Sequence, residues 1–206
     1  MFVAVQLVYS QSSETSGNWQ FRSKDMQWIQ LGYSSNIAGY EVNRALNKVF
    51  WAGRVHVKQG FMLNYQQNLL YYKKFFAIDW GLNAAIWQTA GKHHDLNWPM
   101  EYFPEERFFT CSVFPVFRLN FVHTPKFESY IYYAIGGPSF ISKTVLDNYA
   151  LGKHFIFLDN MGLAAFFGNN KQYNVELRIG HYSNAELFPQ NHGVKVPLTM
   201  LIGYKL

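Results

Sequence analysis

The sequence predicts an all-β protein, an eight-stranded antiparallel transmembrane β-barrel that forms one domain over residues 1–206. Three observations predict this fold. Aromatic residues make up 19% of the chain and charged residues only 15%, whereas soluble domains contain about 25% charged residues. Charge-free stretches such as residues 129–142, which are 14 residues long, are too short for a membrane helix of about 20 residues. Apolar and polar side chains alternate along segments of about 10 residues, the length of a tilted membrane strand.

The charge and the cysteine content exclude other classes. A chain this rich in aromatic residues and this poor in charge is not intrinsically disordered. The formal net charge is +5, but the basic residues are scattered, whereas nucleic-acid-binding domains concentrate them on one face or one helix. We therefore expect no nucleic-acid partner. Cys111 is the only cysteine, so the chain forms no intramolecular disulfide and cysteine usage does not indicate a redox compartment.

Before residue 75 the pattern allows more than one division into strands. Residues 1–20 contain an apolar stretch that no lysine or arginine precedes, which we interpret as a signal remnant, an N-terminal extension or a first strand. Residues 26–33 form the next predicted strand. Residues 47–58 alternate with valines and a tryptophan on one side and charged residues on the other, and residues 61–72 are also strand-like.

The later strands alternate more clearly. In residues 75–88 the even positions are apolar and Asp79 occupies the opposite face; in residues 108–121 the odd positions are apolar and Arg118 occupies the opposite face. With 26–33 and 47–58, the predicted strands number eight, and bacterial barrels contain an even number of strands. The remaining predicted strands are 127–141, 154–168, 172–184 and 196–206.

The connections support a membrane barrel rather than a soluble barrel or sandwich. Residues 124–126 and 168–171 are short and rich in turn-forming residues, whereas residues 89–107, 142–153 and 185–195 are longer and polar. Short turns at one end and long loops at the other are typical of outer-membrane barrels. The last strand is apolar at alternate positions up to its end, like the terminal signal of bacterial outer-membrane barrels. Five tryptophans are expected in the interfacial belts: Trp28, Trp51, Trp80, Trp87 and Trp98.

The candidate catalytic residues lie in the penultimate strand. His181 and Ser183 continue the apolar face of residues 175–179, so they are expected to face lipid beside a long loop, where polar groups are costly without a function. Residues i and i+2 on a strand are about 7 Å apart at Cα, so His181 can accept the Ser183 hydroxyl proton, which activates a serine nucleophile. The alternative is that both are ordinary interfacial polar residues.

The sequence around this pair resembles that of the PagL-type lipid A 3-O-deacylases. His181-Tyr182-Ser183-Asn184-Ala185 is followed by Asn191, Gly193 and one closing strand. Looser similarity extends the match to residues 75–206. The resemblance implies a barrel in the bacterial cell outer membrane that hydrolyses the 3-position acyl ester of lipid A without a metal or other cofactor. It also implies that Ser183 is the nucleophile, His181 the general base and Asn184 an oxyanion-hole contributor.

Two positions depart from the family pattern. Lys195 stands where the family has a glutamate that orients the histidine, and a lysine cannot accept an imidazole N–H. Glu186 replaces a glycine whose backbone N–H is a candidate oxyanion donor. We expect Glu186 to be the third catalytic residue that orients His181, with Asp159 or a backbone carbonyl as alternatives.

The outer loops contain further candidate residues. Lys143, Lys153 and Lys195 are expected to bind the phosphates of lipid A in lipopolysaccharide, although they are also ordinary loop lysines. Residues 92–95, Lys-His-His-Asp, are interpreted as a solvated loop rather than a metal site, and His192 is also expected to be solvated. A homodimer is compatible with the sequence. The alternative function is a non-catalytic barrel for adhesion or envelope integrity.

Overall fold

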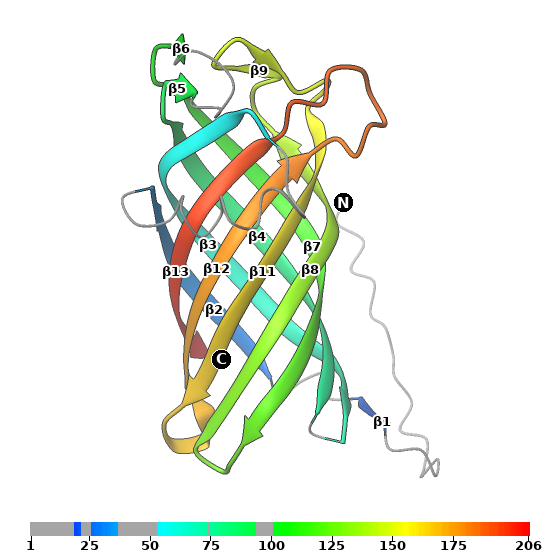
Figure 1. The fold of residues 1–206 in the computed structure, drawn as a ribbon. Helices are drawn as coiled ribbons and strands as arrows, with labels where there is room; N and C mark the ends of the chain where they lie inside the picture. The colour runs from blue at the N-terminus through cyan, green and yellow to red at the C-terminus, as the bar shows by residue number, and fades with distance from the viewer. Residues whose placement is uncertain (1–18, 22–25, 37–52, 74, 94–100) are drawn as a thin grey trace, which may run out of the picture.

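The computed structural model describes residues 19–21, 26–36, 53–73, 75–93 and 101–206, and eight long strands in these ranges close into a ring. Figure 1 shows the strands tilted around a tall barrel. The wall strands are β2 (Gln27–Ser35), β3 (Val55–Tyr72), β4 (Phe76–Thr89), β7 (Arg107–His123), β8 (Phe127–Ile141), β11 (Phe155–Phe167), β12 (Tyr173–Ser183) and β13 (Val194–Lys205).

Short elements lie outside this wall. A three-residue strand pairs with the lower end of β3, a 3-10 turn joins β11 to β12, and two small hairpins project at the opposite end. These elements are β1 (Trp19–Phe21), η1 (Asn169–Lys171), β5 (Lys92–His93), β6 (Glu101–Tyr102), β9 (Val145–Leu146) and β10 (Tyr149–Ala150). Within the described residues, no helix is long and apolar enough to span a membrane.

The ring closes because the last strand pairs with the first wall strand. β13 and β2 are antiparallel, with Met200 opposite Tyr33 and Lys205 opposite Trp28, and every other neighbouring pair of wall strands is also antiparallel. Closure removes the open edge that a flat sheet would expose. β2 ends lower than its neighbours, and above it Lys195 of β13 lies in parallel register with His56 of β3.

The prediction of eight strands is confirmed, but the division before residue 75 is wrong. β3 (Val55–Tyr72) is one strand of 18 residues that joins the separate predicted segments, and residues 47–52 lie outside the described residues. Val55 and Val57 belong to the apolar side predicted for residues 47–58, and both are fully buried inside the barrel. The reason is a register shift between Val57 and Gln59, because an extra residue reverses which face alternate side chains occupy.

The outer surface of the wall is apolar. Large hydrophobic side chains point outward from all eight strands, and the most exposed include Phe61, Leu31 and Ile86 at 66%, 65% and 64%. Polar side chains point inward instead, which is the reverse of a soluble barrel. The wall therefore matches the predicted transmembrane barrel.

A buried ion pair lies in the lumen toward the end of the barrel that has the short turns. Arg118 is completely buried, and its Nε lies 2.7 Å from Asp79 Oδ2. Its guanidinium also lies 4.8 Å from the ring centre of Tyr130 and 5.4 Å from that of Trp28. Buried charges are retained only when they are paired and hydrogen-bonded, and aromatic faces stabilise a cation further. Arg118, which belongs to β7, therefore contacts β4, β8 and β2 from inside the barrel.

Above this pair, the lumen holds aromatic and apolar side chains among polar ones such as Arg178 and Asn160. Trp87, Tyr182 and Leu146 pack there among other buried side chains, and the Trp87 indole N–H donates to Thr110 Oγ1 at 2.9 Å. The expected belt position of Trp87 is therefore wrong, as is that of Trp28. Both are buried because their indole rings fill the lumen. Trp80 is half-buried on the outer face, and Trp51 and Trp98 lie outside the described residues.

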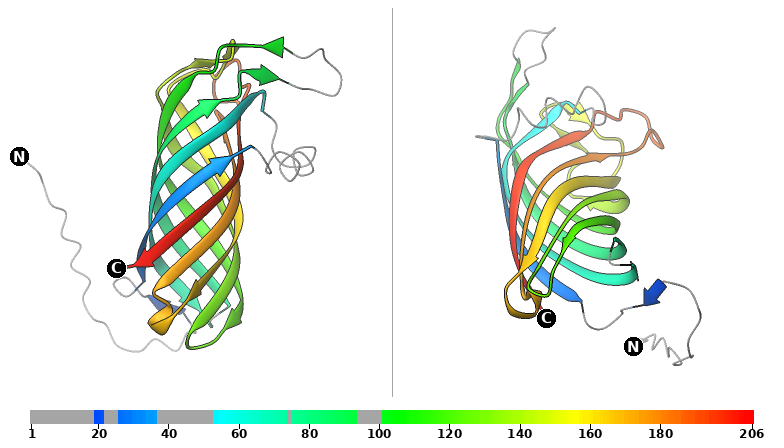
Figure 2. Two further views of the ribbon diagram at one scale, coloured as in Figure 1. Left: turned by 90° about the vertical axis from the view of Figure 1, so that its left-hand side faces the viewer. Right: turned by 60° about the horizontal axis from the view of Figure 1, so that its bottom comes forward.

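The two ends of the barrel differ as predicted. Tight turns join β3 to β4, β7 to β8 and β11 to β12, whereas the β4–β7, β8–β11 and β12–β13 connections are long and lie together at the opposite end. Figure 2 shows this separation in two further views. In an outer-membrane barrel the long loops face the exterior, which places the loop end of β12 at the outer leaflet.

We expect Arg118→Ala to lower the free energy of unfolding by about 3–5 kcal/mol, because it leaves the Asp79 carboxylate buried without its partner. The double variant Asp79→Asn with Arg118→Met removes both charges and should recover most of the loss. Urea unfolding in detergent micelles measures both values. Equal losses in the two variants would contradict a stabilising role for the charge pair.

Candidate functional site

β12 places His181 and Ser183 on the outer face of the wall. Along this strand Arg178 and Tyr182 are buried in the lumen, whereas Leu177 is 44% exposed on the outside. His181 and Ser183 share the alternation of Leu177, so they point away from the lumen. His181 is only 7% exposed, and Ser183, the last residue of β12, is half-buried. His181 and Ser183 therefore have the predicted outward orientation.

A row of polar residues crosses the outer wall at this height. His181 lies opposite Asp159 of β11 on one side and opposite Lys195 of β13 on the other. Directly opposed residues in neighbouring antiparallel strands have Cβ atoms about 4.5–5.5 Å apart. An acid, an imidazole and an amine thus lie side by side on a surface that is otherwise apolar, and Ser183 lies one step above, opposite Phe157.

Asp159 is held by the neighbouring strand. Its Oδ1 accepts the backbone N–H of Gly136 at 2.8 Å. Asp159 sits at a register shift between β11 and β8, where Leu158 pairs with Gly137 and Asn160 with Ala134. Gly136 adopts a φ of +61° there, a left-handed conformation that glycine adopts without strain. Bulges of this kind redirect side chains next to functional sites.

An apolar groove of about 560 Å³ lies directly below the polar row. Its upper edge includes Met161, Ile179 and Leu198, and Met161 pairs with Ile179 one outward-facing step below Asp159 and His181. The groove continues across β8 and β7 over exposed hydrophobic side chains. A flexible hydrocarbon chain is the kind of ligand that such a surface can hold.

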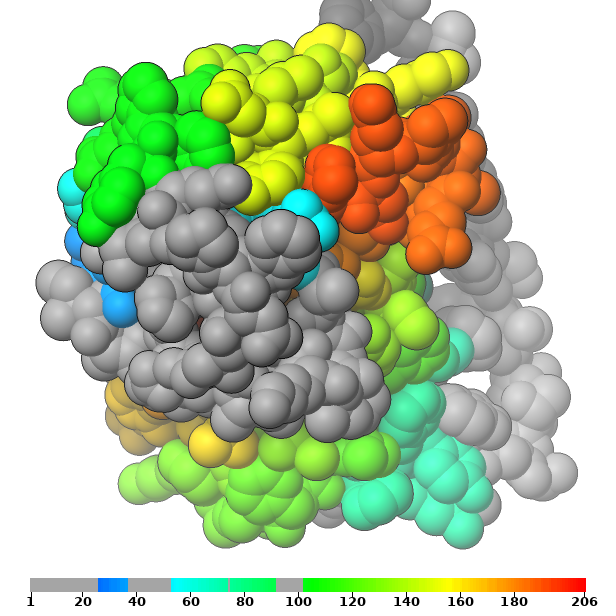
Figure 3. Space-filling view, turned by 45° about the horizontal axis from the view of Figure 1, so that its top comes forward, coloured from blue at the N-terminus to red at the C-terminus, as the bar shows by residue number. Residues whose placement is uncertain are grey.

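Asn184 anchors the loop above the site. Its Nδ2 donates to the carbonyls of Leu151 at 3.1 Å and Phe188 at 3.2 Å. Its backbone N–H donates to Asn191 Oδ1 at 2.9 Å, and its Oδ1 accepts the Glu186 N–H at 2.8 Å. Asn184 is 1% exposed, and Figure 3 shows the β12–β13 loop lying against the β8–β11 loop.

Glu186 lies in this loop and not in the polar row. Its side chain is exposed, and its φ of +61° follows a φ of +51° at Ala185. A left-handed backbone explains why the family resemblance expects a glycine at this position. The expected role of Glu186 as the third catalytic residue stays a prediction.

The expected phosphate-binding lysines have different surroundings. Lys195 stands beside His181, and Lys153 Nζ lies 4.8 Å from the ring centre of Phe188 in the loop above the site. Lys143 Nζ instead forms an ion pair with Glu106 at 2.6 Å. Of the segment 92–95, the structure describes the backbone of Lys92 and His93 in β5 and does not describe the other two residues.

Two further loop residues lie near the site. His192, which is expected to be solvated, is half-buried, and its ring centre lies 5.3 Å from that of Tyr149. Burial, and then the charge of Arg54, lower the pKa of His192 below its usual range. Arg54 was missed altogether; its N–H donates to the His192 carbonyl at 2.7 Å. Its proximity arises from the contact between β3 and β13, which no local sequence pattern indicates.

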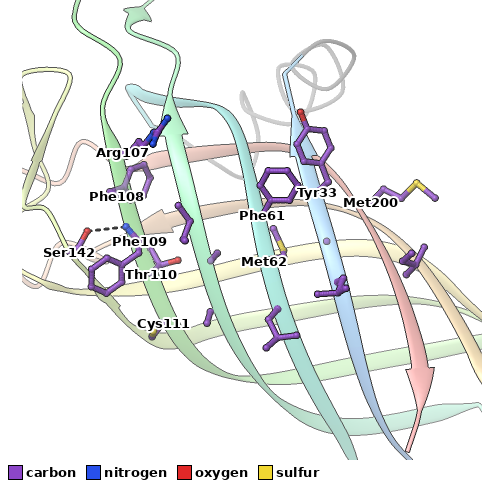
Figure 4. A pocket seen from close by; sticks show the side chains of 17 residues that line it. Tyr33, Phe61, Met62, Arg107, Phe108, Phe109, Thr110, Cys111, Ser142 and Met200 are labelled. Carbon is purple, nitrogen blue, oxygen red and sulfur yellow. Dashed lines mark hydrogen bonds between the residues drawn. The ribbon is translucent and has the colours of Figure 1, made fainter.

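A larger hollow lies on another part of the outer surface. It measures about 1010 Å³ and spans the outer faces of β13, β2, β3, β4 and β7 (Figure 4). Its lining is mostly apolar, and Ser142 Oγ accepts the Phe109 N–H at 2.9 Å. It contains no histidine or carboxylate beside a hydroxyl, so the arrangement that can support acid–base chemistry is the one on β12.

Comparisons with known proteins agree with this fold. The sequence model of the family described as lipid A 3-O-deacylase (PagL) matches residues 59–203. The crystal structure of the outer membrane enzyme PagL is similar with a TM-score of 0.56 and 16% identity, over 87% of this chain and 99% of that chain. No curated protein sequence matches this chain.

Two further solved structures are more distant. The Yersinia pestis outer membrane protein Ail in a phospholipid bilayer nanodisc aligns with a TM-score of 0.40 and 13% identity, over 89% of this chain and 100% of that chain. LpxR from Salmonella typhimurium aligns with a TM-score of 0.28 and 9% identity, over 87% of this chain and 100% of that chain.

We expect Asn184→Asp to loosen the β12–β13 loop, because it removes both Nδ2 donors and keeps the Oδ1 acceptor for Glu186. Leaving buried carbonyls without donors should lower the free energy of unfolding by about 1–3 kcal/mol. Hydrogen exchange of residues 184–193 should accelerate while the strands stay protected. Unchanged exchange in this loop would contradict the anchoring role of Asn184.

Proposed function

The chain belongs to the lipid A 3-O-deacylase (PagL) family, and we propose that it is an outer-membrane serine esterase that hydrolyses the 3-position acyl ester of lipid A. The observation that carries this proposal is the outward orientation of His181 and Ser183 at the loop end of β12. In this orientation the pair meets lipid of the outer leaflet, and a membrane-anchored substrate can reach it by lateral diffusion.

The proposed reaction follows serine esterase chemistry. His181 takes the proton of Ser183 Oγ as the oxygen attacks the ester carbonyl carbon. Collapse of the tetrahedral intermediate breaks the bond to the 3-position oxygen of lipid A, and this oxygen receives the proton from His181. Water, deprotonated by His181, then attacks the carbonyl carbon of the acyl-enzyme. Collapse of this second intermediate breaks the bond to Ser183 Oγ, which takes the proton from His181 as the fatty acid leaves. The imidazole is therefore neutral again at the end of each half-reaction.

Asn184 is the proposed contributor to oxyanion stabilisation. Its backbone N–H directly follows Ser183 in the chain and now donates to Asn191 Oδ1 at 2.9 Å. In the reaction this N–H would exchange that acceptor for the developing oxyanion. Donors aimed at the oxyanion contribute about 3–4 kcal/mol to acyl-transfer catalysis in other enzymes.

The surroundings of the pair fit the two parts of the substrate. The apolar groove of about 560 Å³ below Met161 and Ile179 can accommodate the acyl chain, because it faces the hydrocarbon region. Lys153 and Lys195 lie above or beside the pair, at the level where lipid A phosphates are expected, and lysine binds phosphate as a point charge. The expected homodimer stays a prediction, which crosslinking in native membranes can measure.

We expect Ser183→Ala to reduce the rate of lipid A deacylation by about 10³-fold or more, because it removes the nucleophile. Mass spectrometry of lipid A from cells that express each variant measures the loss of the 3-position acyl chain. Ser142→Ala is the matched control, a serine at the same end of the barrel that should retain activity. An unmodified acyl pattern with the wild-type protein would instead favour a non-catalytic role in adhesion or envelope integrity.

We expect Lys153→Ala to raise KM about fivefold with little change in kcat, since an exposed ionic contact contributes about 1 kcal/mol. Lys143→Ala is the comparison, because Lys143 lies in the same connection but pairs with Glu106; its KM should not change. Kinetics on lipid A in mixed micelles measure both values. The same KM for the wild type and Lys153→Ala would remove Lys153 from the binding site.

A further inference from the structure

The proposed esterase needs a group that orients His181, and Lys195 cannot serve because it has no acceptor. We infer that Asp159 is this positioning residue, acting on His181 from the neighbouring strand β11. The inference rests on the proposed function. It depends on the register in which Asp159 lies directly opposite His181, on the side of β12 away from Lys195.

Asp159 has a unique place among the acids of the wall. The eight wall strands contain four acidic residues. Asp79, Glu128 and Glu176 are at most 1% exposed and pair with lumenal arginine or lysine. Asp159 shares the outward alternation of Leu163 and Phe155. A carboxylate on the lipid side of a barrel strand is destabilising without a compensating role, and the one in this wall stands beside His181.

A backbone hydrogen bond holds the Asp159 side chain in place for this role. The Gly136 N–H donates to Asp159 Oδ1 at 2.8 Å. Within the described residues, this is the hydrogen bond that the Asp159 carboxylate forms. A carboxylate has about four acceptor sites, so Oδ2 remains available for an imidazole N–H. Holding one oxygen on β8 restricts the side chain to the outer surface between β8 and β12. The bulge at Leu158/Asn160 and the left-handed Gly136 therefore position an acceptor beside the histidine.

The other candidates fit less well. Glu186 is exposed in the loop after β12, and its N–H is tied back to Asn184; it has no register partner in the wall. On the far side of His181, Lys195 and then His56 continue the row. A neighbouring ammonium disfavours the imidazolium that forms during catalysis, which increases the need for a carboxylate on the opposite side.

In the proposed site, Asp159 accepts the N–H of one imidazole nitrogen and leaves the other nitrogen to take the Ser183 proton. This fixes the tautomer and stabilises the imidazolium, and the carboxylate itself stays ionised. No atom of Asp159 touches the substrate. Its loss should therefore lower kcat and leave KM unchanged, because substrate contacts with the groove and the lysines remain.

The test compares Asp159→Asn, Asp159→Glu and Glu186→Gln with the wild-type full chain in outer-membrane vesicles. Asp159→Asn should lower kcat about 10²–10⁴-fold at unchanged KM, and Asp159→Glu should recover at least tenfold of that loss. Glu186→Gln tests the other candidate acid and should lower kcat less than Asp159→Asn does. The double variant Asp159→Asn/Lys195→Glu supplies an acceptor from the opposite strand and should regain activity over Asp159→Asn.

The outcomes separate this inference from the proposed function. If Ser183→Ala is inactive while Asp159→Asn keeps wild-type kcat, the esterase stands and Asp159 is not its positioning residue. The same holds if Glu186→Gln, and not Asp159→Asn, loses kcat. If Asp159→Asn loses activity through KM or through lower barrel yield on a heat-shift gel, the positioning role is also overturned. Failure of the proposed function itself would appear as a wild-type protein that leaves lipid A unchanged.

Discussion

The structure depends first on the requirement that every backbone N–H and C=O inside a bilayer find a partner within the protein. The chain meets this requirement by pairing β13 with β2, which closes the sheet into a ring. Closure fixes the register of each strand, and the register fixes which side chains face lipid. His181 is consequently an outward residue with defined neighbours, because it belongs to β12 in a closed sheet.

Polar residues in the lumen and polar residues on the outer wall then have different roles. In the lumen, Arg118 and Asp79 neutralise each other among aromatic rings, so the barrel is filled and is not a pore. On the outer wall, a histidine, an acid and an amine interrupt an apolar surface at the loop end of β12. The first group stabilises the scaffold, and the second is placed where a lipid substrate can reach it. The proposed catalysis needs no cavity inside the barrel.

The sequence predicted the features that follow from local alternation. β4, β7 and β12 have the predicted faces, and the outward position of Ser183 follows from the same period of two. Features that depend on bulges or on distant strands were not predictable. The register shift after Val57 reversed the face of β3, and Trp28 lies in the lumen because it packs against Arg118. The pairing of Asp159 with His181 was only an alternative, since register between strands is absent from a single sequence.

We propose that the outer wall at β12 is an active site with Ser183 as its nucleophile. The most direct measurement is covalent labelling of the full-length protein in outer-membrane vesicles by a lipophilic fluorophosphonate, with the labelled residue identified by peptide mass spectrometry. We expect Ser183 to be labelled and His181→Ala to prevent the reaction. Labelling at another serine, or equal labelling without His181, would contradict it.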